Sequence, residues 1–131
     1  MVEGAVTRAE MLARTRRFAL RAVKFVTCLP AKPEMRTIGM QLLRSATSVG
    51  ANYRAACRAR SRAEFISKMS IVEEEADESQ YWLELLADLA VPAASELREL
   101  SAEASQIVAI AVASKKTARR GGLNRRTGSD A

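Results

Sequence analysis

Apolar residues recur every three or four positions along most of the chain, the spacing that places side chains on one face of an α-helix. Four segments carry this pattern, at about residues 7–29, 34–59, 61–90 and 93–118. Prolines at positions 30, 33 and 92 interrupt it, because proline cannot continue the hydrogen-bond ladder of a helix. No segment shows the alternation typical of a strand. The pattern predicts an all-α protein, an antiparallel up-down-up-down bundle of four helices.

One apolar stripe in each segment predicts the side of that helix which faces the core. In the first two segments the stripe consists of Met11, Thr15, Phe18, Ala22, Phe25 or Val26, Leu29, Ile38, Leu42, Ala46 or Ser45, Val49, Tyr53 and Ala56. In the last two it consists of Phe65, Met69, Val72, Ala76, Ser79, Leu83, Leu86, Ala90, Leu97, Leu100, Ala104, Ile107 and Ala111. The third segment adds a second strip, whose residues Trp82, Leu85 and Leu89 suit a contact between subunits.

Two local features refine the predicted helices. The run Ser61-Arg62-Ala63-Glu64 matches a capping box, which predicts the start of the third helix. Gly39 and Gly50 lie inside the second segment, where each costs roughly 1 kcal/mol relative to alanine. We therefore expect these glycines to permit the close approach of another helix.

The end of the chain differs in composition from the rest. Residues 119–131 show no helical periodicity and contain four arginines and three glycines. We predict a bundle domain over residues 1–118 and a disordered basic tail over residues 119–131.

The net charge of +6 is distributed unevenly along the chain. Residues 1–62 carry 13 basic and 3 acidic side chains, residues 63–114 carry 2 and 11, and residues 115–131 carry 6 and 1. Either the basic helices pack beside acidic ones, within a chain or between subunits, or a free basic surface attracts a polyanion. The sequence is compatible with both.

The composition argues against an enzyme. Histidine is absent, and the two cysteines are too few for a disulfide scaffold or a cysteine-only metal site. The acidic run at residues 73–78 lacks the histidines of carboxylate-bridged metal bundles, so we expect it to be solvated or paired with arginines. We predict no catalytic residue, metal or cofactor. With no leader and no long apolar run, we expect a cytoplasmic protein.

Several stretches resemble one bacterial family. They are residues 41–54 (QLLRSATSVGANYR), 58–68 (RARSRAEFISK), 75–86 (EADESQYWLELL) and 110–120 (IAVASKKTARR). With them the chain resembles the four-helix bundle proteins, also called ribosomal-RNA intervening-sequence proteins, some of which are encoded inside large-subunit ribosomal RNA genes.

This resemblance implies an antiparallel bundle that assembles as a homopentamer and has no established enzyme activity. Relatives that serve diversity-generating retroelements are basic pentamers that bind a reverse transcriptase and nucleic acid. Two positions depart from the family pattern. Ala55 stands where an acidic residue is usual, and Glu74 stands where a basic residue is frequent. Both departures increase the charge separation.

Two groups of residues are candidates for function. The candidates for phosphate contacts with nucleic acid are Lys115, Lys116, Arg119, Arg120, Arg125 and Arg126, with Arg14, Arg17 and Arg21 as a second surface. The candidates for a contact between subunits are Arg54, Arg58, Arg62, Trp82, Leu85 and Leu89. The arginines at 54, 58 and 62 repel one another at one-turn spacing, so they favour an acidic partner, which could be the third helix or phosphate.

A further polar group lies on the second helix and has two interpretations. Its residues are Arg44, Ser45, Ser48, Asn52 and Arg54. They either fix helix register through hydrogen bonds or contact phosphate. Cys28 and Cys57 are expected to be buried and inert.

The most concrete functional hypothesis is a small, basic, oligomeric adaptor that binds nucleic acid, with RNA favoured, through phosphate contacts. Few aromatic residues are free to stack, so we expect low sequence specificity. The alternative is a protein–protein scaffold whose charges serve only self-assembly.

Overall fold

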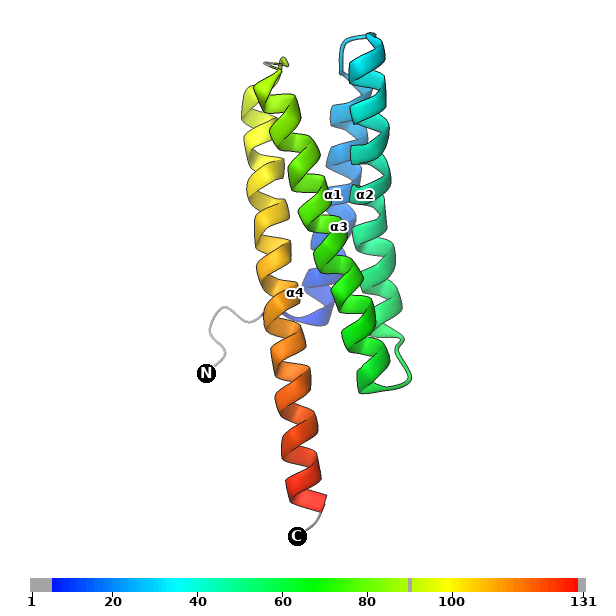
Figure 1. Ribbon diagram of the computed structural model, residues 1–131, viewed down its shortest axis with the longest axis vertical. Coiled ribbons are helices and arrows are strands. Elements are labelled where there is room, and N and C mark those ends of the chain that lie inside the picture. The colour runs from blue at the N-terminus through cyan, green and yellow to red at the C-terminus, as the bar shows by residue number, and fades with distance from the viewer. Residues whose placement is uncertain (1–5, 90, 130–131) are drawn as a thin grey trace.

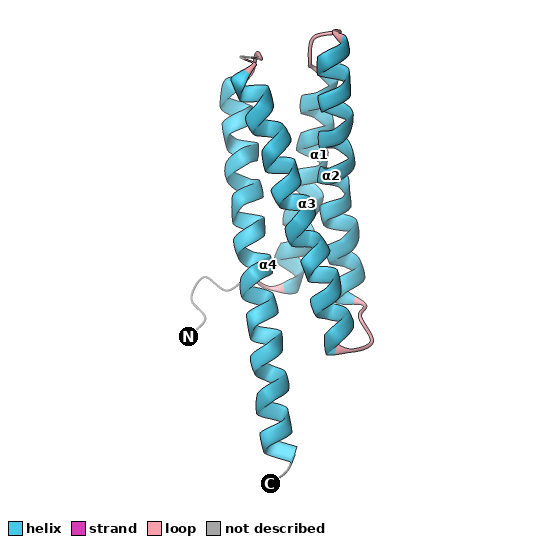
Figure 2. Ribbon diagram, in the orientation of Figure 1, coloured by secondary structure: helices cyan, strands magenta, loops and turns pink. Residues whose placement is uncertain are grey.

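The computed structural model describes the backbone of residues 6–89 and 91–129, and the side chains of these ranges as far as residue 121. Its helices are α1 (Arg8–Thr27), α2 (Pro33–Cys57), α3 (Arg62–Asp88) and α4 (Ala94–Ser129). They lie side by side, and the chain reverses direction at each turn (Figure 1). Short loops join the helices, and no residue of the described ranges belongs to a strand (Figure 2). The prediction of an all-α four-helix bundle is confirmed.

Side-chain caps define the starts of two helices. The Thr7 hydroxyl accepts a hydrogen bond from the backbone nitrogen of Glu10 at 3.1 Å, and the Ser61 hydroxyl accepts one from that of Glu64 at 3.0 Å. The Glu64 carboxylate in turn accepts from the backbone nitrogen of Arg60 at 3.1 Å. The capping box is therefore present, with its return bond one residue earlier than the predicted pattern requires.

The predicted stripes form the core. The buried residues of α1 and α2 are Met11, Thr15, Phe18, Ala22, Phe25, Met35, Gly39, Leu42, Ser45, Ala46, Val49, Tyr53 and Ala56. Those of α3 and the described part of α4 are Met69, Val72, Ala76, Ser79, Leu83, Leu86, Leu97, Leu100, Ala104, Ile107 and Ala111. Ile38 and Phe65 are only partly buried, whereas Met35 and Val91 join the core near helix ends. Ala90 lies outside the described residues.

The glycines differ in how closely their neighbours approach. A Cβ atom on Gly39 would lie 3.1 Å from Val26 Cγ1 and 3.2 Å from Leu29 Cδ1, tighter than ordinary contact. A Cβ atom on Gly50 would lie 3.5 Å from the Thr15 backbone, an ordinary distance. A side chain at position 39 would therefore require Val26 and Leu29 to shift slightly, whereas position 50 has room for one.

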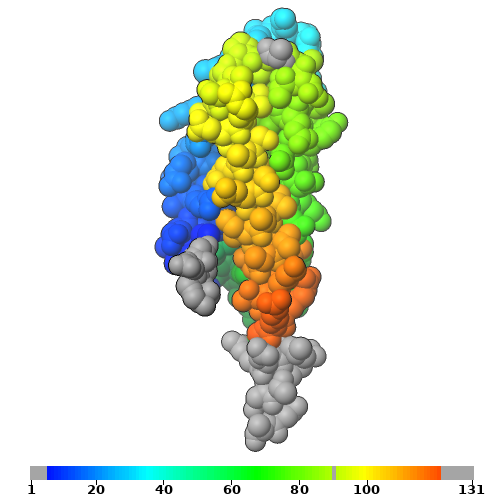
Figure 3. Space-filling view, turned by 90° about the vertical axis from the view of Figure 1, so that its left-hand side faces the viewer, coloured from blue at the N-terminus to red at the C-terminus, as the bar shows by residue number. Residues whose placement is uncertain are grey.

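The last helix extends further than the sequence pattern indicates. α4 continues to Ser129, so its backbone is helical where we predicted a disordered segment from Arg119. Its last part projects beyond the end of the bundle (Figure 1), and its earlier part lies along the face between α1 and α3 (Figure 3). Apolar periodicity indicates a helix face packed against other helices, and the last part of α4 extends beyond the other helices. Extending an existing helix also avoids the cost of nucleation.

No helix in the described part of the chain has the length and apolar character needed to cross a membrane.

Candidate nucleic-acid interface

Two arginines of α1 are paired with acidic side chains of α4. Arg14 donates two parallel hydrogen bonds to Glu103, from Nε at 2.9 Å and from Nη2 at 2.7 Å. Arg21 pairs with Glu96 and, at 3.1 Å, with Glu99. Hydrogen bonds to these carboxylates raise the pKa of both arginines. Arg14, the earlier arginine of α1, pairs with the later acid of α4, and Arg21 pairs with the earlier acids, as antiparallel helices require.

These pairs change the interpretation of the predicted second basic surface. Two of its three members, Arg14 and Arg21, contact acids of their own chain. The third, Arg17, is exposed and lines a shallow hollow of about 350 Å³ that also contains Arg14, Arg21 and Glu103. This face therefore carries less free positive charge than its sequence indicates.

The acidic run of α3 pairs with an arginine of α2, which is one of the two arrangements expected for it. Arg44 contacts Glu75 at 3.4 Å and also pairs with Glu78. Trp82 Nε1 donates to Glu78 at 3.0 Å. The pKa of Glu78 is lowered, first by the hydrogen bond from Trp82 and then by Arg44.

The predicted C-terminal cations fall into three groups. Lys115 is 14% exposed, pairs with Glu73 at 2.7 Å and donates to Ser70 at 3.1 Å, so it joins α4 to α3. The side chains of Lys116, Arg119 and Arg120 are exposed. The side chains of Arg125 and Arg126 lie outside the described residues.

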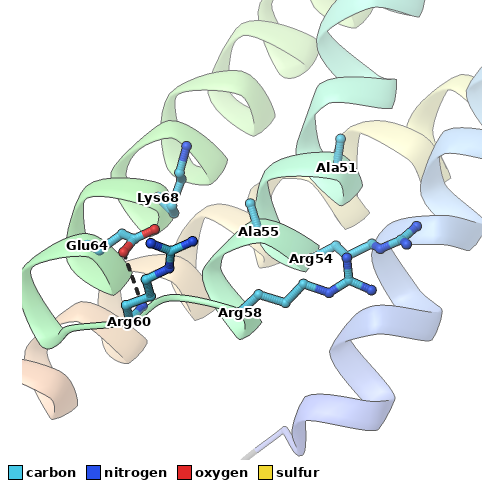
Figure 4. Close-up of a pocket in the computed structure, with 7 residues that line it drawn as sticks. All are labelled: Ala51, Arg54, Ala55, Arg58, Arg60, Glu64 and Lys68. Atoms are coloured by element: carbon cyan, nitrogen blue, oxygen red, sulfur yellow. Dashed lines mark hydrogen bonds between the residues drawn. The ribbon is translucent and has the colours of Figure 1, made fainter.

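A basic hollow of about 590 Å³ opens where α2 ends and α3 begins. Its lining residues are Ala51, Arg54, Ala55, Arg58, Arg60, Glu64 and Lys68. Arg54 projects from α2 and Arg58 from the cap that follows it, while Glu64 and Lys68 project from α3 (Figure 4). Within the described part of the chain, none of the four cations forms an ion pair. The hollow therefore combines four positive side chains with one carboxylate, which makes it suited to anions.

The hollow belongs to a wider basic end of the bundle, which we define by the start of α1, the α2–α3 turn and the projecting part of α4 (Figure 1). The described cations at this end are Arg8, Arg54, Arg58, Arg60, Arg62, Lys68, Lys116, Arg119 and Arg120. Burial raises the pKa of the Tyr53 hydroxyl to about 12. The positive charge of Arg8 acts in the opposite direction and favours the ionised form of Tyr53, so the two residues lie near each other. α1 and α2 thus contribute to the same basic end.

Sequence reasoning placed Arg54 and Arg58 at a subunit contact and left out Lys68. The missing signal was the turn itself. An antiparallel turn brings the last turn of α2 beside the first turns of α3, so Arg54, Arg58 and Lys68 line the same hollow. Ala55, which departs from the family pattern, lies in this hollow and adds no negative charge to it.

The other predicted contact residues belong to α3 or to its C-terminal cap. Arg62 is half-buried at the start of α3. Trp82 and Leu85 are half-buried within their own chain, and the Trp82 ring meets that of Tyr81 edge-on, with centroids 5.0 Å apart. Leu89 is 48% exposed. Only the end of this strip is therefore open.

The polar group of α2 fixes helix register at one position. The Ser45 and Ser79 hydroxyls form a buried hydrogen bond of 2.9 Å between α2 and α3. Asn52 bonds back to Ser48 on its own helix. The hydrogen-bonding interpretation is thus supported for Ser45. The expectation of buried cysteines was wrong for Cys28, which is exposed at the end of α1, because the chain turns there.

The described part of the chain contains no cluster of three or more cysteine, aspartate or glutamate residues placed to hold a metal ion.

Four antiparallel helices, intrachain ion pairs and a basic end define the class, a small basic four-helix bundle protein. The family model described as the 23S rRNA-intervening sequence protein matches residues 7–113. The chain belongs to this family, as its motifs predicted.

A solved structure has the same fold. It is a protein of unknown function from the S23 ribosomal protein family of Bacteroides thetaiotaomicron, 32% identical to this chain. The match covers 83% of this chain and 97% of that one, with a TM-score of 0.75. No curated protein matches the chain.

Proposed function

We propose that this protein is a non-enzymatic adaptor of the cytoplasm that binds nucleic acid, RNA in preference, through phosphate contacts at its basic end. The observation that carries the proposal is the basic hollow, whose four cations have no acidic partner in the described part of the chain. Like charges at such spacing repel, and a polyanion relieves that repulsion.

The ion pairs divide the basic residues into two groups. Arg14, Arg21, Arg44 and Lys115 hold helices together. We assign phosphate contacts to the free group, Arg54, Arg58, Arg60, Lys68, Lys116, Arg119 and Arg120. Arginine suits this role because its planar guanidinium can donate two hydrogen bonds to one phosphate.

Low sequence specificity follows from the aromatic residues. Tyr53 is buried, and the Trp82 indole nitrogen is bound to Glu78, so neither is placed to stack on a base at the basic end. Phosphate contacts position a protein on nucleic acid without reading its sequence.

The test is a fluorescence-anisotropy titration with a labelled structured RNA at about 50 and about 200 mM salt. The double variant Arg54→Gln with Arg58→Gln should bind about tenfold more weakly at low salt and show a shallower salt dependence, because two phosphate contacts are lost. The matched control is Arg36→Gln with Arg98→Gln, two exposed arginines away from the basic end. Equal binding by both double variants, or no binding by the wild type at low salt, overturns the proposal.

We propose self-association, most simply as a homopentamer, as a second property. Leu20 is 52% exposed, Met40 58% and Leu89 48%, and exposed side chains of this size favour burial against another surface. If nucleic-acid binding fails while assembly persists, a protein–protein scaffold becomes the better description.

A further inference from the structure

A second hollow, of about 380 Å³, lies between α1 and α2. Its lining residues are Leu12, Ala13, Thr15, Arg16, Ala19, Thr47, Gly50, Ala51 and Arg54. Small side chains keep it open: Ala13 and Ala19 come from α1, and Gly50 and Ala51 come from α2. We call this hollow the apolar groove.

The apolar groove is continuous with the basic hollow. Ala51 and Arg54 line both, so the outer ridge of α2 separates a cationic side from an apolar side. Arg54 extends from this ridge toward α1 (Figure 4), and Arg16 borders the groove from α1. Neither arginine forms an ion pair with any residue whose side chain the structure describes.

We infer that the apolar groove receives a base of a single-stranded nucleic acid whose phosphates occupy the basic hollow. This inference rests on the proposed function and deepens it. A nucleotide combines a flat, weakly polar base with an anionic phosphate, which matches an apolar groove sharing a wall with a cationic hollow. Guanidinium groups stack on bases, so Arg16 can hold the base at the groove's edge, while Arg54, which lines both hollows, contacts the phosphate.

The inferred mode has a consequence for the form of nucleic acid. The bases of a duplex are stacked and paired inside it, whereas those of a single strand can turn outward into a groove. A protein that used only the basic hollow would bind any strand of equal charge. A protein that also uses the groove distinguishes strands with bases from strands without them.

The experiment compares three labelled probes of equal length, about 12 nucleotides, at about 50 mM salt. They are a single-stranded RNA, its duplex, and a strand with the same phosphates but without bases. We expect the wild type to bind the single strand about tenfold more tightly than the abasic strand. This difference in affinity lies near the lower end of what one stacked base contributes. Equal affinity for these two probes overturns the inference while leaving phosphate binding intact.

The variant that tests the groove is Ala13→Leu, which fills it without adding charge or weakening the helix. Single-strand affinity should fall about fivefold, while affinity for the abasic strand stays unchanged. The matched control is Ala109→Leu, an exposed alanine of α4, which should change neither. An equal loss for both probes, or no loss for either, contradicts the inference. Circular dichroism verifies folding of each variant.

A second variant tests the groove independently of Ala13→Leu. Arg16→Gln should reduce binding of the single strand more than that of the abasic strand, whereas Arg36→Gln should not separate the two probes. A free mononucleotide serves as competitor. Weak competition supports a strand as the ligand, because several phosphates contribute to its binding. If the mononucleotide competes as well as the strand, a free nucleotide replaces the strand as the ligand. If an apolar peptide binds in the groove and no nucleotide competes with it, the inference is wrong.

Discussion

Arg14 and Arg54 occupy similar places in the sequence, each in a basic stretch of a helix, but their surroundings differ. Arg14 meets a carboxylate of α4 in a two-bond ion pair, whereas Arg54 lies between two hollows and has no ion pair in the described part of the chain. Sequence spacing shows that both are cations. It cannot show the partner, because the partner of Arg14 is Glu103, far away along the chain.

Glu78 provides a prediction about acid stability. Its pKa is lowered in the folded state, so its contribution to the free energy of unfolding is complete above the ordinary value of 4.5 and is lost as pH falls through the folded value. We expect the stability difference between the wild type and Glu78→Gln to shrink between about pH 5 and about pH 3.

Urea unfolding at several pH values measures this difference. Glu84→Gln is the matched control, because Glu84 is exposed on the same helix and forms no ion pair with the described side chains. A difference for Glu78→Gln that stays constant across this pH range would show that the contacts with Trp82 and Arg44 do not stabilise the fold.

At the scale of the helices, the glycines of α2 give a paired prediction. Gly50→Ala should raise the free energy of unfolding by up to about 1 kcal/mol, because alanine favours a helix and its Cβ meets only an ordinary contact. Gly39→Ala gains the same propensity, but Val26 and Leu29 must move, so we expect it to be neutral or destabilising by about 1 kcal/mol.

Thermal and urea unfolding of both variants test the pair. Ala51→Gly in the same helix checks the size of the propensity effect at an exposed position. If Gly39→Ala stabilises as much as Gly50→Ala, the close approach of α1 to α2 at Gly39 does not constrain the fold.

The helices were the most predictable part of the molecule. Apolar residues such as Phe18, Leu42 and Leu83 repeat at helical spacing, so the pattern identified their buried faces directly. The capping box located the start of α3 for the same local reason. The far end of α4 was not predictable in this way, because apolar periodicity indicates packing against other helices and this part of α4 extends beyond them (Figure 1).

At the scale of the whole molecule, exposed apolar side chains predict self-association. We expect light scattering or native mass spectrometry to give a mass several times that of one chain, and this mass to persist at about 500 mM salt because apolar contacts are not screened. Leu89→Gln should reduce it.

Leu20→Gln is the informative comparison, because Leu20 lies on α1 and is equally exposed. If Leu20→Gln dissociates the assembly and Leu89→Gln does not, the contact between subunits lies on α1 and not at Leu89. A monomeric wild type would refute the assembly proposal.

The candidate site was only partly predictable. The excess of positive charge in the sequence indicated an anionic partner, but four of the named cations form ion pairs with acids of their own chain. The basic hollow depends on which helix ends meet, and this emerges only once the turn between α2 and α3 has formed. Residues such as Arg60 and Lys68 therefore acquire a shared role through folding that their spacing alone does not express.

The concentration of cations at one end also affects how the molecule meets a ligand. A body with its excess positive charge at one tip has an electric dipole moment along its length, and the field of a polyanion turns that tip forward before contact. For the proposed ligand, encounters are then end-on and their rate falls as ionic strength rises. Leu20 on α1 and Leu89 at the opposite end of α3 remain free for other copies while the tip is occupied.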